Sequence, residues 1–257
     1  MPPNKQWNVL CWNVRGINSE KKQLAICNAI DVSGCSVVCL QETKHSCFDA
    51  SFVKLFCPKK FDIFAFVPSA GASGGLITVW MSLVFTGVPV FSESFALGVR
   101  LTSTQSADSW TLVNVYGPCA DTNRVLFVSW LFDIDIPRGD DWLLMGDFNF
   151  IRKPEDRNKH GGDVNEMLMF NEAISELGLI ELPLKGRQFS WSNMQDNPLL
   201  EKLDWFFTSA AWMTSYPDSV ALPLAKPIFD HLPCMIKIGT NIPKSKVFRS
   251  ENYWLNH

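Results

Sequence analysis

The stretch LLMGDFNFI, residues 143–151, places an acid and an amide directly after an apolar run and a glycine. A short apolar run bounded by a turn signal is consistent with a buried strand. Asp147 and Asn149 would then stand where that strand ends, although a hydrophobic core gains nothing from either side chain. Ligands of α/β sheets bind beyond strand ends, so this stretch indicates a polar site at a sheet edge.

The same layout recurs at five other places in the chain. Each time a short apolar run adjoins a polar residue: Asn13 in VLCWN, Glu42 in VVCLQE, Tyr116 in TLVNVY, Asp204 in EKLD, and Asp230 with His231 in IFDHLP. Any one of them has an ordinary explanation, such as a turn cap or a surface ion pair. If the strands belong to facing sheets, their ends converge on one rim.

The remaining pattern alternates between strands and helices. Helical patterns occupy 19–34, 122–134 and 163–179, with Ser19, Thr122 and Asp163 as their N-caps. Apolar runs typical of strands outnumber them and lie at 7–12, 36–41, 61–66, 75–80, 82–91, 95–101, 109–116, 141–146, 201–208, 219–224 and 233–238. Mixed sheets covered by helices on their outer faces follow from this pattern.

Composition bounds the class of protein. The chain has 257 residues, of which 47% are hydrophobic and 19% charged, enough for one large domain or two small ones with a packed core. No apolar run approaches the roughly 18–20 residues of a membrane-spanning helix, and the N-terminus lacks the layout of a signal peptide. The net charge of −3 argues mildly against nucleic-acid binding, but a carboxylate site that holds a divalent cation carries negative charge of its own.

The eight cysteines lie at irregular spacings, several inside apolar runs. Such residues are expected as buried, reduced thiols. The chain has no paired CxxC clusters of the kind that bind zinc. We therefore expect a reducing, intracellular compartment.

Six motifs occur in a fixed order: LCWNVRGIN, CLQETK, NVYGP, LLMGDFN, KLDWFF and DHLP. Together they resemble the motif set of the endonuclease/exonuclease/phosphatase superfamily, and within it the endonuclease domain of plant LINE-type (non-LTR) retrotransposons. SGGLITVW (73–80), FSWSN (189–193) and FRSENYWLNH (248–257) are similar to that group as well. The resemblance implies a DNase I-like α/β fold, a four-layer sandwich of two packed mixed β-sheets flanked by helices. The domain would span residues 1–240, with 241–257 as a C-terminal tail or the start of a linker.

The resemblance also implies a metal-dependent reaction. It assigns Glu42 as a ligand of Mg²⁺, with Mn²⁺ as a substitute, beside Asn13 and Asp230. Hard cations of this kind prefer oxygen ligands and stabilise charge on a phosphoryl group. Asp147 would orient or deprotonate the attacking water, and Asn149 would hold that water or a phosphoryl oxygen.

Three further roles follow from the same resemblance. A protonated His231 would stabilise the developing charge, Asp204 would orient its imidazole, and Tyr116 would donate to a phosphate oxygen. The implied reaction is the nicking of a DNA phosphodiester bond, which in a retroelement primes reverse transcription at the target. A full-length element would add a reverse transcriptase domain. The expected protein is a monomer with a DNA substrate and no membrane, nuclear if it acts on chromosomal DNA.

Other segments have competing interpretations. The basic loop 152–162 is either a solvated loop or a phosphate-contacting surface, and Ser190 is a weak candidate for contact with the DNA backbone. Substrate choice is expected in the loops 67–74, 185–200 and 225–229. The histidines at 45 and 160 are given no catalytic role.

One residue departs from the family pattern. Phe229 precedes the Asp230–His231 pair, where a serine is usual in the family, so a hydroxyl is missing and activity is expected to be reduced. Two alternatives stay open. The chain could be a phosphatase or an RNA deadenylase on the same scaffold, or a degenerate, non-catalytic copy of the domain.

Overall fold

The computed structural model describes residues 6–71, 73–106, 108–119, 121–137, 139–225 and 229–239. Within these ranges the chain forms two six-stranded mixed sheets and a two-stranded hairpin. The first sheet has the order β13-β14-β1-β2-β4-β3, with β1 (Trp7–Asn13), β2 (Val37–Gln41), β3 (Ile63–Val67), β4 (Leu76–Trp80), β13 (Val220–Pro223) and β14 (Cys234–Ile238).

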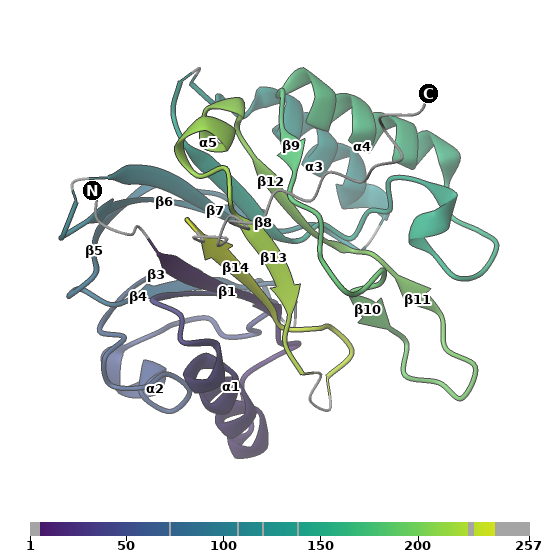
Figure 1. Ribbon diagram of the computed structural model, residues 1–257. Helices are drawn as coiled ribbons and strands as arrows, with labels where there is room; N and C mark the ends of the chain where they lie inside the picture. Colours follow the sequence, from purple (N-terminus) through teal and green to yellow (C-terminus); the bar gives the residue numbers. More distant parts are fainter. Residues whose placement is uncertain are drawn as a thin grey trace, which may run out of the picture.

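The second sheet has the order β5-β6-β7-β8-β12-β9. Its strands are β5 (Phe85–Ser92), β6 (Ala96–Ser103), β7 (Ser109–Tyr116), β8 (Trp142–Asp147), β9 (Ile180–Glu181) and β12 (Asp204–Thr208). The hairpin pairs β10 (Trp191–Ser192) with β11 (Leu200–Glu201), and it projects beside the second sheet (Figure 1). The predicted strand 201–208 is therefore divided, because Leu200–Glu201 pair with β10 before β12 begins.

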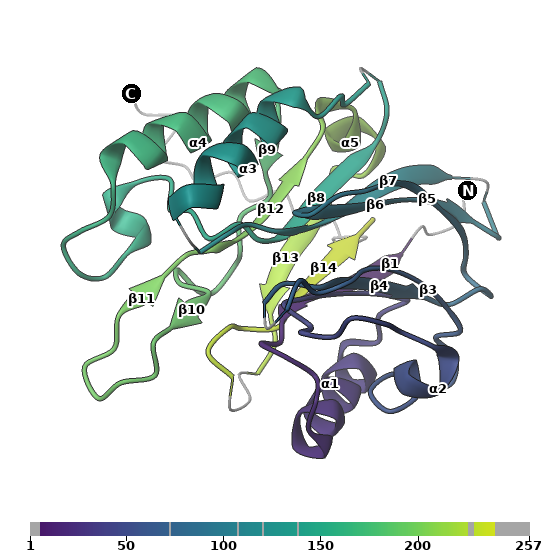
Figure 2. The same ribbon diagram turned by 180° about the vertical axis from the view of Figure 1, so that it is seen from behind.

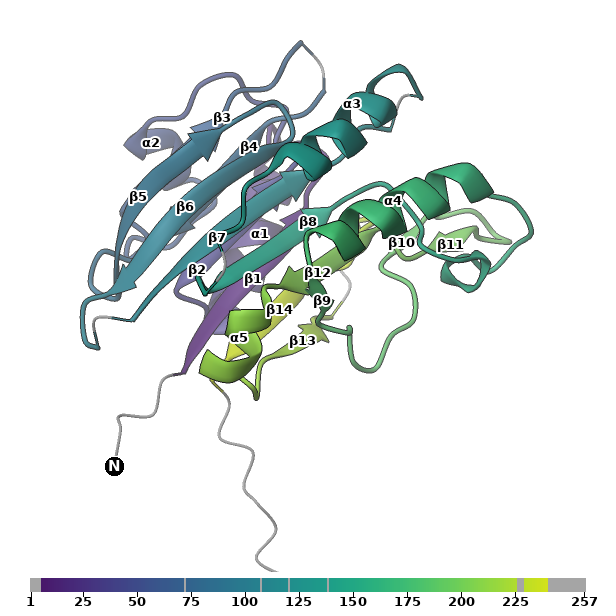
Figure 3. The same ribbon diagram turned by 90° about the horizontal axis from the view of Figure 1, so that it is seen from above.

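Helices cover the outer faces of both sheets. α1 (Glu20–Ser33) and α2 (Ala50–Val53) lie on the first sheet, whereas α3 (Asp121–Asp133) and α4 (Val164–Glu176) lie on the second (Figures 1 and 2). From above, α3 and α4 run along β7, β8 and β12 (Figure 3). A 3-10 turn (Pro154–Asp156) and α5 (Ala210–Ser215) complete the elements. The order helix, sheet, sheet, helix confirms the expected four-layer α/β sandwich.

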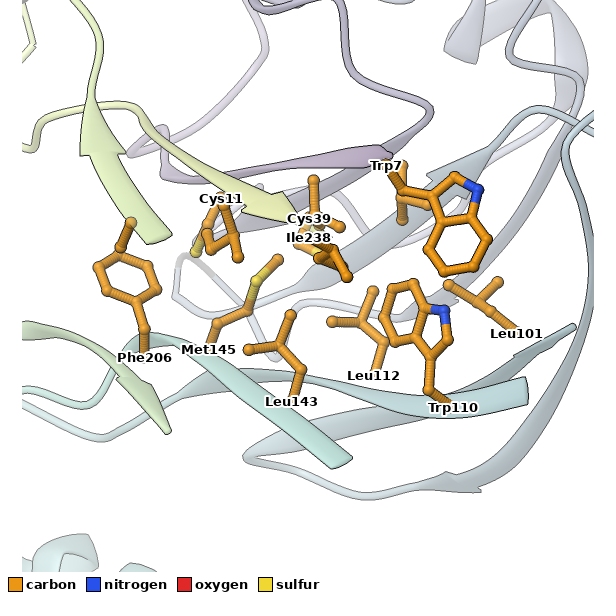
Figure 4. Close-up of a cluster of buried hydrophobic side chains, with 14 of the residues drawn as sticks. Trp7, Cys11, Cys39, Leu101, Trp110, Leu112, Leu143, Met145, Phe206 and Ile238 are labelled. Carbon is orange, nitrogen blue, oxygen red and sulfur yellow. The ribbon is translucent and has the colours of Figure 1, made fainter. Parts of the chain in front are cut away.

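Both faces of the central strands are buried, which explains their unbroken apolar runs. In β1, Val9 and Cys11 belong to the core between the sheets, whereas Leu10 and Trp12 pack toward the helices of the first sheet. The core between the sheets also holds Met145 of β8 (Figure 4). The sequence thus alternates between two cores at the period of two that a strand imposes.

The starts of α1 and α4 follow the expected signals, whereas α3 begins at Asp121, so the prediction of Thr122 as its N-cap is wrong. Ser19 caps α1 by accepting a hydrogen bond from the backbone N–H of Lys22, and Asp163 caps α4 in the same manner. Gly34 ends α1 in the left-handed conformation, with φ of 58°. Within the described residues, no helix combines the length and the apolar character that crossing a membrane requires. All eight cysteines are free, and five of them are buried.

The expected tail, residues 241–257, lies outside the described residues, so the domain boundary near residue 240 stays a prediction.

A polar side chain joins the two sheets inside the core. Asn114 of β7 accepts a hydrogen bond from Gln41 of β2 at 2.6 Å. It also donates to the backbone carbonyls of Leu40 (3.3 Å) and Ile77 (3.1 Å) in the first sheet. A buried amide that bonds across two sheets fixes their relative position, because any slip would leave these polar groups unpaired.

We expect Asn114→Ala to lower the free energy of unfolding by about 1–3 kcal/mol, because Gln41 loses its shortest hydrogen bond and the Ile77 carbonyl loses its donor from Asn114. Urea denaturation followed by circular dichroism measures this change. Thr86→Ala on the exposed edge strand β5 is the control, with an expected change within about 0.5 kcal/mol. Equal unfolding free energies for the two variants would contradict this account of the sheet interface.

Candidate active site

The strand directions bring the polar strand ends together. β1 runs parallel to β2, and β7 runs parallel to β8, so each pair ends at the same edge of its sheet. β12 is antiparallel to β8 and begins there, with Asp204 opposite Asp147 in the register. Tyr116 lies opposite Asp147 on the other side. Three predicted site residues of the second sheet are therefore neighbours by register alone.

The first sheet supplies its residues in the same way. β1 ends at Asn13, and Glu42 follows the last residue of β2. β14 is antiparallel to β1, so the segment that precedes it, with Asp230 and His231, returns to the end of β1. The indole N–H of Trp12 donates to the His231 carbonyl oxygen at 3.2 Å and holds this segment in place.

One chain of polar contacts crosses from the first sheet to the second. Asn13 Nδ2 donates to Glu42 Oε2 at 3.2 Å and to Asp147 Oδ2 at 2.8 Å. Asp147 Oδ2 lies 3.5 Å from His231 Nε2, and His231 Nδ1 lies 2.9 Å from Asp204 Oδ2. Five of the eight predicted site residues are thus in direct contact, although up to 218 residues separate them in the chain, from 13 to 231.

Burial sets the electrostatics of the centre. Asp147, Asp204 and His231 are at most 2% exposed. Burial raises the pKa of Asp147 toward neutrality, and the nearby His231 opposes that shift. Burial alone would lower the pKa of His231, but the charges of Asp204 and Asp147 outweigh it and raise that pKa to about 9. The imidazole is therefore a cation at neutral pH.

Local backbone geometry explains the residues around Asp147. A Cβ on Gly146 would lie 1.9 Å from the Val115 carbonyl oxygen, so only glycine fits against β7. Asn149 adopts a left-handed backbone with φ of 56°, a conformation that asparagine tolerates. Its amide donates to the Gly117 carbonyl oxygen at 2.7 Å, and its backbone N–H donates to Asp147 Oδ1 at 3.0 Å. Asn149 thereby fixes the carboxylate of Asp147.

Tyr116 is half-buried at the same rim. Burial raises the pKa of its hydroxyl, and the negative charges of Glu42 and Asp147 raise it further. The hydroxyl therefore stays protonated and can donate a hydrogen bond.

Two cations occupy the side of the site nearest the solvent. Arg15 Nε lies 2.7 Å from Asp230 Oδ2 and 3.6 Å from Glu42 Oε2. Lys44 Nζ lies 3.0 Å from Glu42 Oε1. Asp230 also accepts a hydrogen bond from the Trp191 indole at 3.1 Å. Asp230 therefore joins the other predicted residues through Arg15, and all eight lie around one centre.

Two sets of acids could hold a cation. Asp147, Asp204 and His231 place ligand atoms within 4.8 Å of one another. His231 Nδ1 is already engaged by Asp204 in a hydrogen bond of 2.9 Å, so that nitrogen is not free to bind a metal. Glu42 lies at the rim, where a cation can keep part of its water shell as Mg²⁺ prefers. The oxygen donors of Glu42 and Asp230 fit such a cation, which would displace Arg15 and Lys44 from them.

The structure corrects the interpretation of Ser190. Its hydroxyl is fully buried and accepts the backbone N–H groups of Leu203 and Asp204 at 3.1 and 3.0 Å. Ser190 therefore positions the start of β12 and cannot contact DNA.

Three basic residues of the 152–162 loop make internal contacts. Arg152 pairs with Glu181, Arg157 pairs with Glu201, and Lys159 donates to the carbonyl oxygen of residue 197. These contacts favour the structural explanation for most of the loop.

Phe229 does not displace its neighbours from the site. Its ring is 4% exposed and packs edge-to-face on Trp12 at 4.5 Å between ring centroids. The backbone N–H of His231 still caps the Asp230 carboxylate at 3.1 Å. The phenylalanine thus extends the core beneath α1.

The sequence analysis missed Arg15, Lys44 and Trp191. Arg15 and Lys44 each follow a predicted ligand by two residues, in WNVRG and QETK. That spacing could have indicated them as site residues, because a carboxylate that binds a metal also attracts a nearby basic side chain when the metal is absent. Trp191 gave no signal of its own among ten tryptophans.

Comparison with solved structures supports the fold. A search of curated proteins finds no match. The fold is similar to AP endonuclease LMAP from Leishmania major, with 18% identity, 93% of this chain and 89% of that chain covered, and a TM-score of 0.69. The Xenopus laevis APE2 catalytic domain is 19% identical, with 90% of this chain and 91% of that chain covered and a TM-score of 0.68. The endonuclease domain of TRAS1, a telomere-specific non-LTR retrotransposon, is 11% identical, with 91% of this chain and 98% of that chain covered and a TM-score of 0.64.

The sequence itself matches a family whose description is endonuclease/exonuclease/phosphatase, over residues 10–226. That range includes the ends of β1, β2, β7 and β8 and the start of β12, and it covers far more than half of the chain. This protein therefore belongs to the endonuclease/exonuclease/phosphatase family.

Proposed function

We propose that the protein is a Mg²⁺-dependent endonuclease that hydrolyses one phosphodiester bond of DNA and leaves a nick. The observation that carries the proposal is the continuous contact from Glu42 through Asn13 and Asp147 to His231 and Asp204. It places a candidate metal ligand, a candidate base and a protonated imidazole around one point. Each of these groups can lower the barrier to phosphodiester hydrolysis: the base acts on the water, and the metal and the imidazole stabilise negative charge.

The divalent cation would be held by Glu42, with Asn13 and Asp230 beside it. When bound, it polarises the phosphoryl oxygens and stabilises the leaving oxygen, and Mn²⁺ can substitute for Mg²⁺ on oxygen ligands. Arg15 and Lys44 neutralise these carboxylates in the absence of the cation.

Asp147 is proposed as the group that orients and deprotonates the attacking water. A base works best when its pKa is near the working pH, and burial moves the pKa of Asp147 in that direction. Asn149 and Asn13 hold its two oxygens from opposite sides, so the carboxylate has a fixed direction.

His231 is proposed to stabilise negative charge on the phosphoryl group. Its Nε2 is buried, lies 3.5 Å from Asp147 Oδ2, and makes no hydrogen bond within the described residues. A buried donor without a hydrogen bond is costly, and a phosphoryl oxygen would satisfy it. Asp204 acts as a positioning residue that fixes the ring through Nδ1, and Tyr116 would add a donor to the phosphate.

DNA is the favoured substrate over a small phosphate ester or RNA. Two similar structures are named for DNA-related roles: the TRAS1 retrotransposon endonuclease domain, and Danio rerio TDP2 complexed with a single-strand DNA product. The motifs of plant LINE-type elements favour nicking at a target site. In a full-length element, a reverse transcriptase domain would then use the nick as a primer.

Such a nuclease would be a monomer and would act in the nucleus. A phosphatase, a deadenylase or a non-catalytic copy are the alternatives.

We expect the protein to convert supercoiled plasmid to relaxed circles with Mg²⁺ and to lose this activity in EDTA. Asp147→Ala and His231→Ala should each lower the rate by roughly 10²–10⁴, the usual effect of removing a general base or a charge stabiliser. Gel electrophoresis over time measures the rates. Asp133→Ala, an exposed acid at the end of α3, is the matched control. If the wild type and the two site variants behave alike, the nuclease proposal is wrong.

The pKa of His231 gives a second measurement. In metal-free protein, its ring protons should titrate by NMR near pH 9, so the imidazole is charged at pH 7. Asp204→Asn should lower that pKa, because the charge that raises it is removed while the effect of burial remains. Asp133→Asn should leave the titration in place. An unchanged midpoint in Asp204→Asn would show that Asp204 does not hold the imidazole.

The hypothesis that Phe229 lowers activity stays a prediction. Phe229→Ser should raise the nicking rate by restoring a hydroxyl beside the Asp230–His231 pair. It should also cost about 3 kcal/mol of stability, since a buried ring is lost. Rates are therefore compared well below the melting temperature. Phe229→Ala removes the ring without adding a hydroxyl, so it separates the effect of the hydroxyl from the effect of the lost ring. Equal nicking rates for the wild type and the serine variant would show that the phenylalanine does not lower activity.

A further inference from the structure

A second concave surface lies between α4, the 3-10 turn after β8, and strands β9 and β12. It is a cleft of about 560 Å³. Four basic residues from three segments line it: Arg152, Lys153, Arg187 and Lys202. We call this surface the cationic cleft. None of the eight residues of the candidate active site lines it.

The cationic cleft carries an excess of positive charge. Its two acids are Asp156 and Glu181. Asp156 is buried and accepts the backbone N–H groups of Arg152 and Lys153 at 3.0 and 3.1 Å, so it points into the protein. Glu181 alone is shared by Arg152 at 2.7 Å and Lys202 at 2.6 Å. In a chain of net charge −3, this local excess of positive charge favours the binding of an anionic partner.

Two of the four cations are available to a ligand. Lys153 and Arg187 are exposed, and neither forms an ion pair with another described residue. The other two are held in place: Lys202 lies over the Trp205 ring at 4.1 Å, and Arg152 Nε donates a hydrogen bond to Asn171 Oδ1 at 2.7 Å. Cations that are already ordered lose little entropy when they bind an anion.

The cationic cleft continues toward the candidate active site. Arg187 and Gln188 also line a smaller hollow of about 120 Å³, together with Trp191 and Ser192. Trp191 donates to the Asp230 carboxylate, and the Ser192 N–H donates to the Asp230 carbonyl oxygen at 3.1 Å. The smaller hollow therefore shares Arg187 and Gln188 with the cationic cleft, and Trp191 and Ser192 join it to Asp230 of the candidate active site.

We propose that the cationic cleft binds the sugar–phosphate backbone of the substrate DNA at a distance from the scissile bond. This inference rests on the proposed nuclease function. Contacts of Lys and Arg with phosphates are independent of sequence and fix the register of a protein on its nucleic acid. The cleft would thus hold the strand while Asp147 and His231 act on one phosphate.

The test compares Lys153→Ala/Arg187→Ala with Lys54→Ala/Lys59→Ala, which removes two exposed cations near α2. Fluorescence anisotropy with a labelled 20-base-pair duplex in EDTA gives Kd as a function of salt. Each lost phosphate contact should lower the slope of log K against log salt by about 0.9. We therefore expect the cleft variant to lose close to two units of slope, and the control variant to keep the slope of the wild type. Both variants should keep the melting temperature of the wild type.

Plasmid nicking separates this proposal from the nuclease proposal. The cleft variant should keep kcat at saturating DNA and raise KM by roughly tenfold or more, because binding and not chemistry is weakened. If the wild type nicks DNA but the cleft and control variants share its slope and KM, the cationic cleft plays no part in binding DNA. Saturable binding of inorganic phosphate without any effect of the substitutions on DNA affinity would overturn the proposal in favour of a small-anion site. A wild type that neither nicks nor binds DNA would refute the proposed function itself.

Discussion

The hydrogen bonds of the Asn13 amide are the contacts on which the centre depends. This side chain stands at the end of β1 in the first sheet and reaches Glu42 of the same sheet and Asp147 of the second. A single buried donor thereby brings together two carboxylates that would otherwise repel each other. The strand ends can form one centre only while the two sheets keep their positions, and Asn114 in the core below fixes those positions.

The protein buries acids and balances them with cations of different kinds. His231 balances Asp147 and Asp204 in the interior, whereas Arg15 and Lys44 balance Glu42 and Asp230 at the rim. A buried, unpaired charge is expensive, so each acid keeps a partner. The left-handed backbone at Glu42 and Asn149 adds local strain of the kind found at functional sites. Both features are compatible with a stable domain because three buried cores surround them.

The distribution of charge matters more than its sum. A net charge of −3 would argue against a nucleic-acid partner if the charges were spread evenly. They are not, because acids gather at the candidate active site and bases gather in the cationic cleft. A bound divalent cation would reverse the sign of the net charge at the centre itself. Both the metal-loaded centre and the cationic cleft would then attract a phosphate backbone.

The sequence by itself determined the layers, most strands and the residue types of the site. Apolar runs buried on both faces predict central strands, and polar residues such as Asp147 and Glu42 mark where those strands end. Tertiary structure alone decided which side chains face the site. Ser190 was a candidate for contact with DNA but is buried, and Arg15, which was not predicted as a site residue, bridges two acids. Strand period and burial are local properties of the chain, whereas these contacts join segments more than ten residues apart, whose meeting depends on how the two sheets pack.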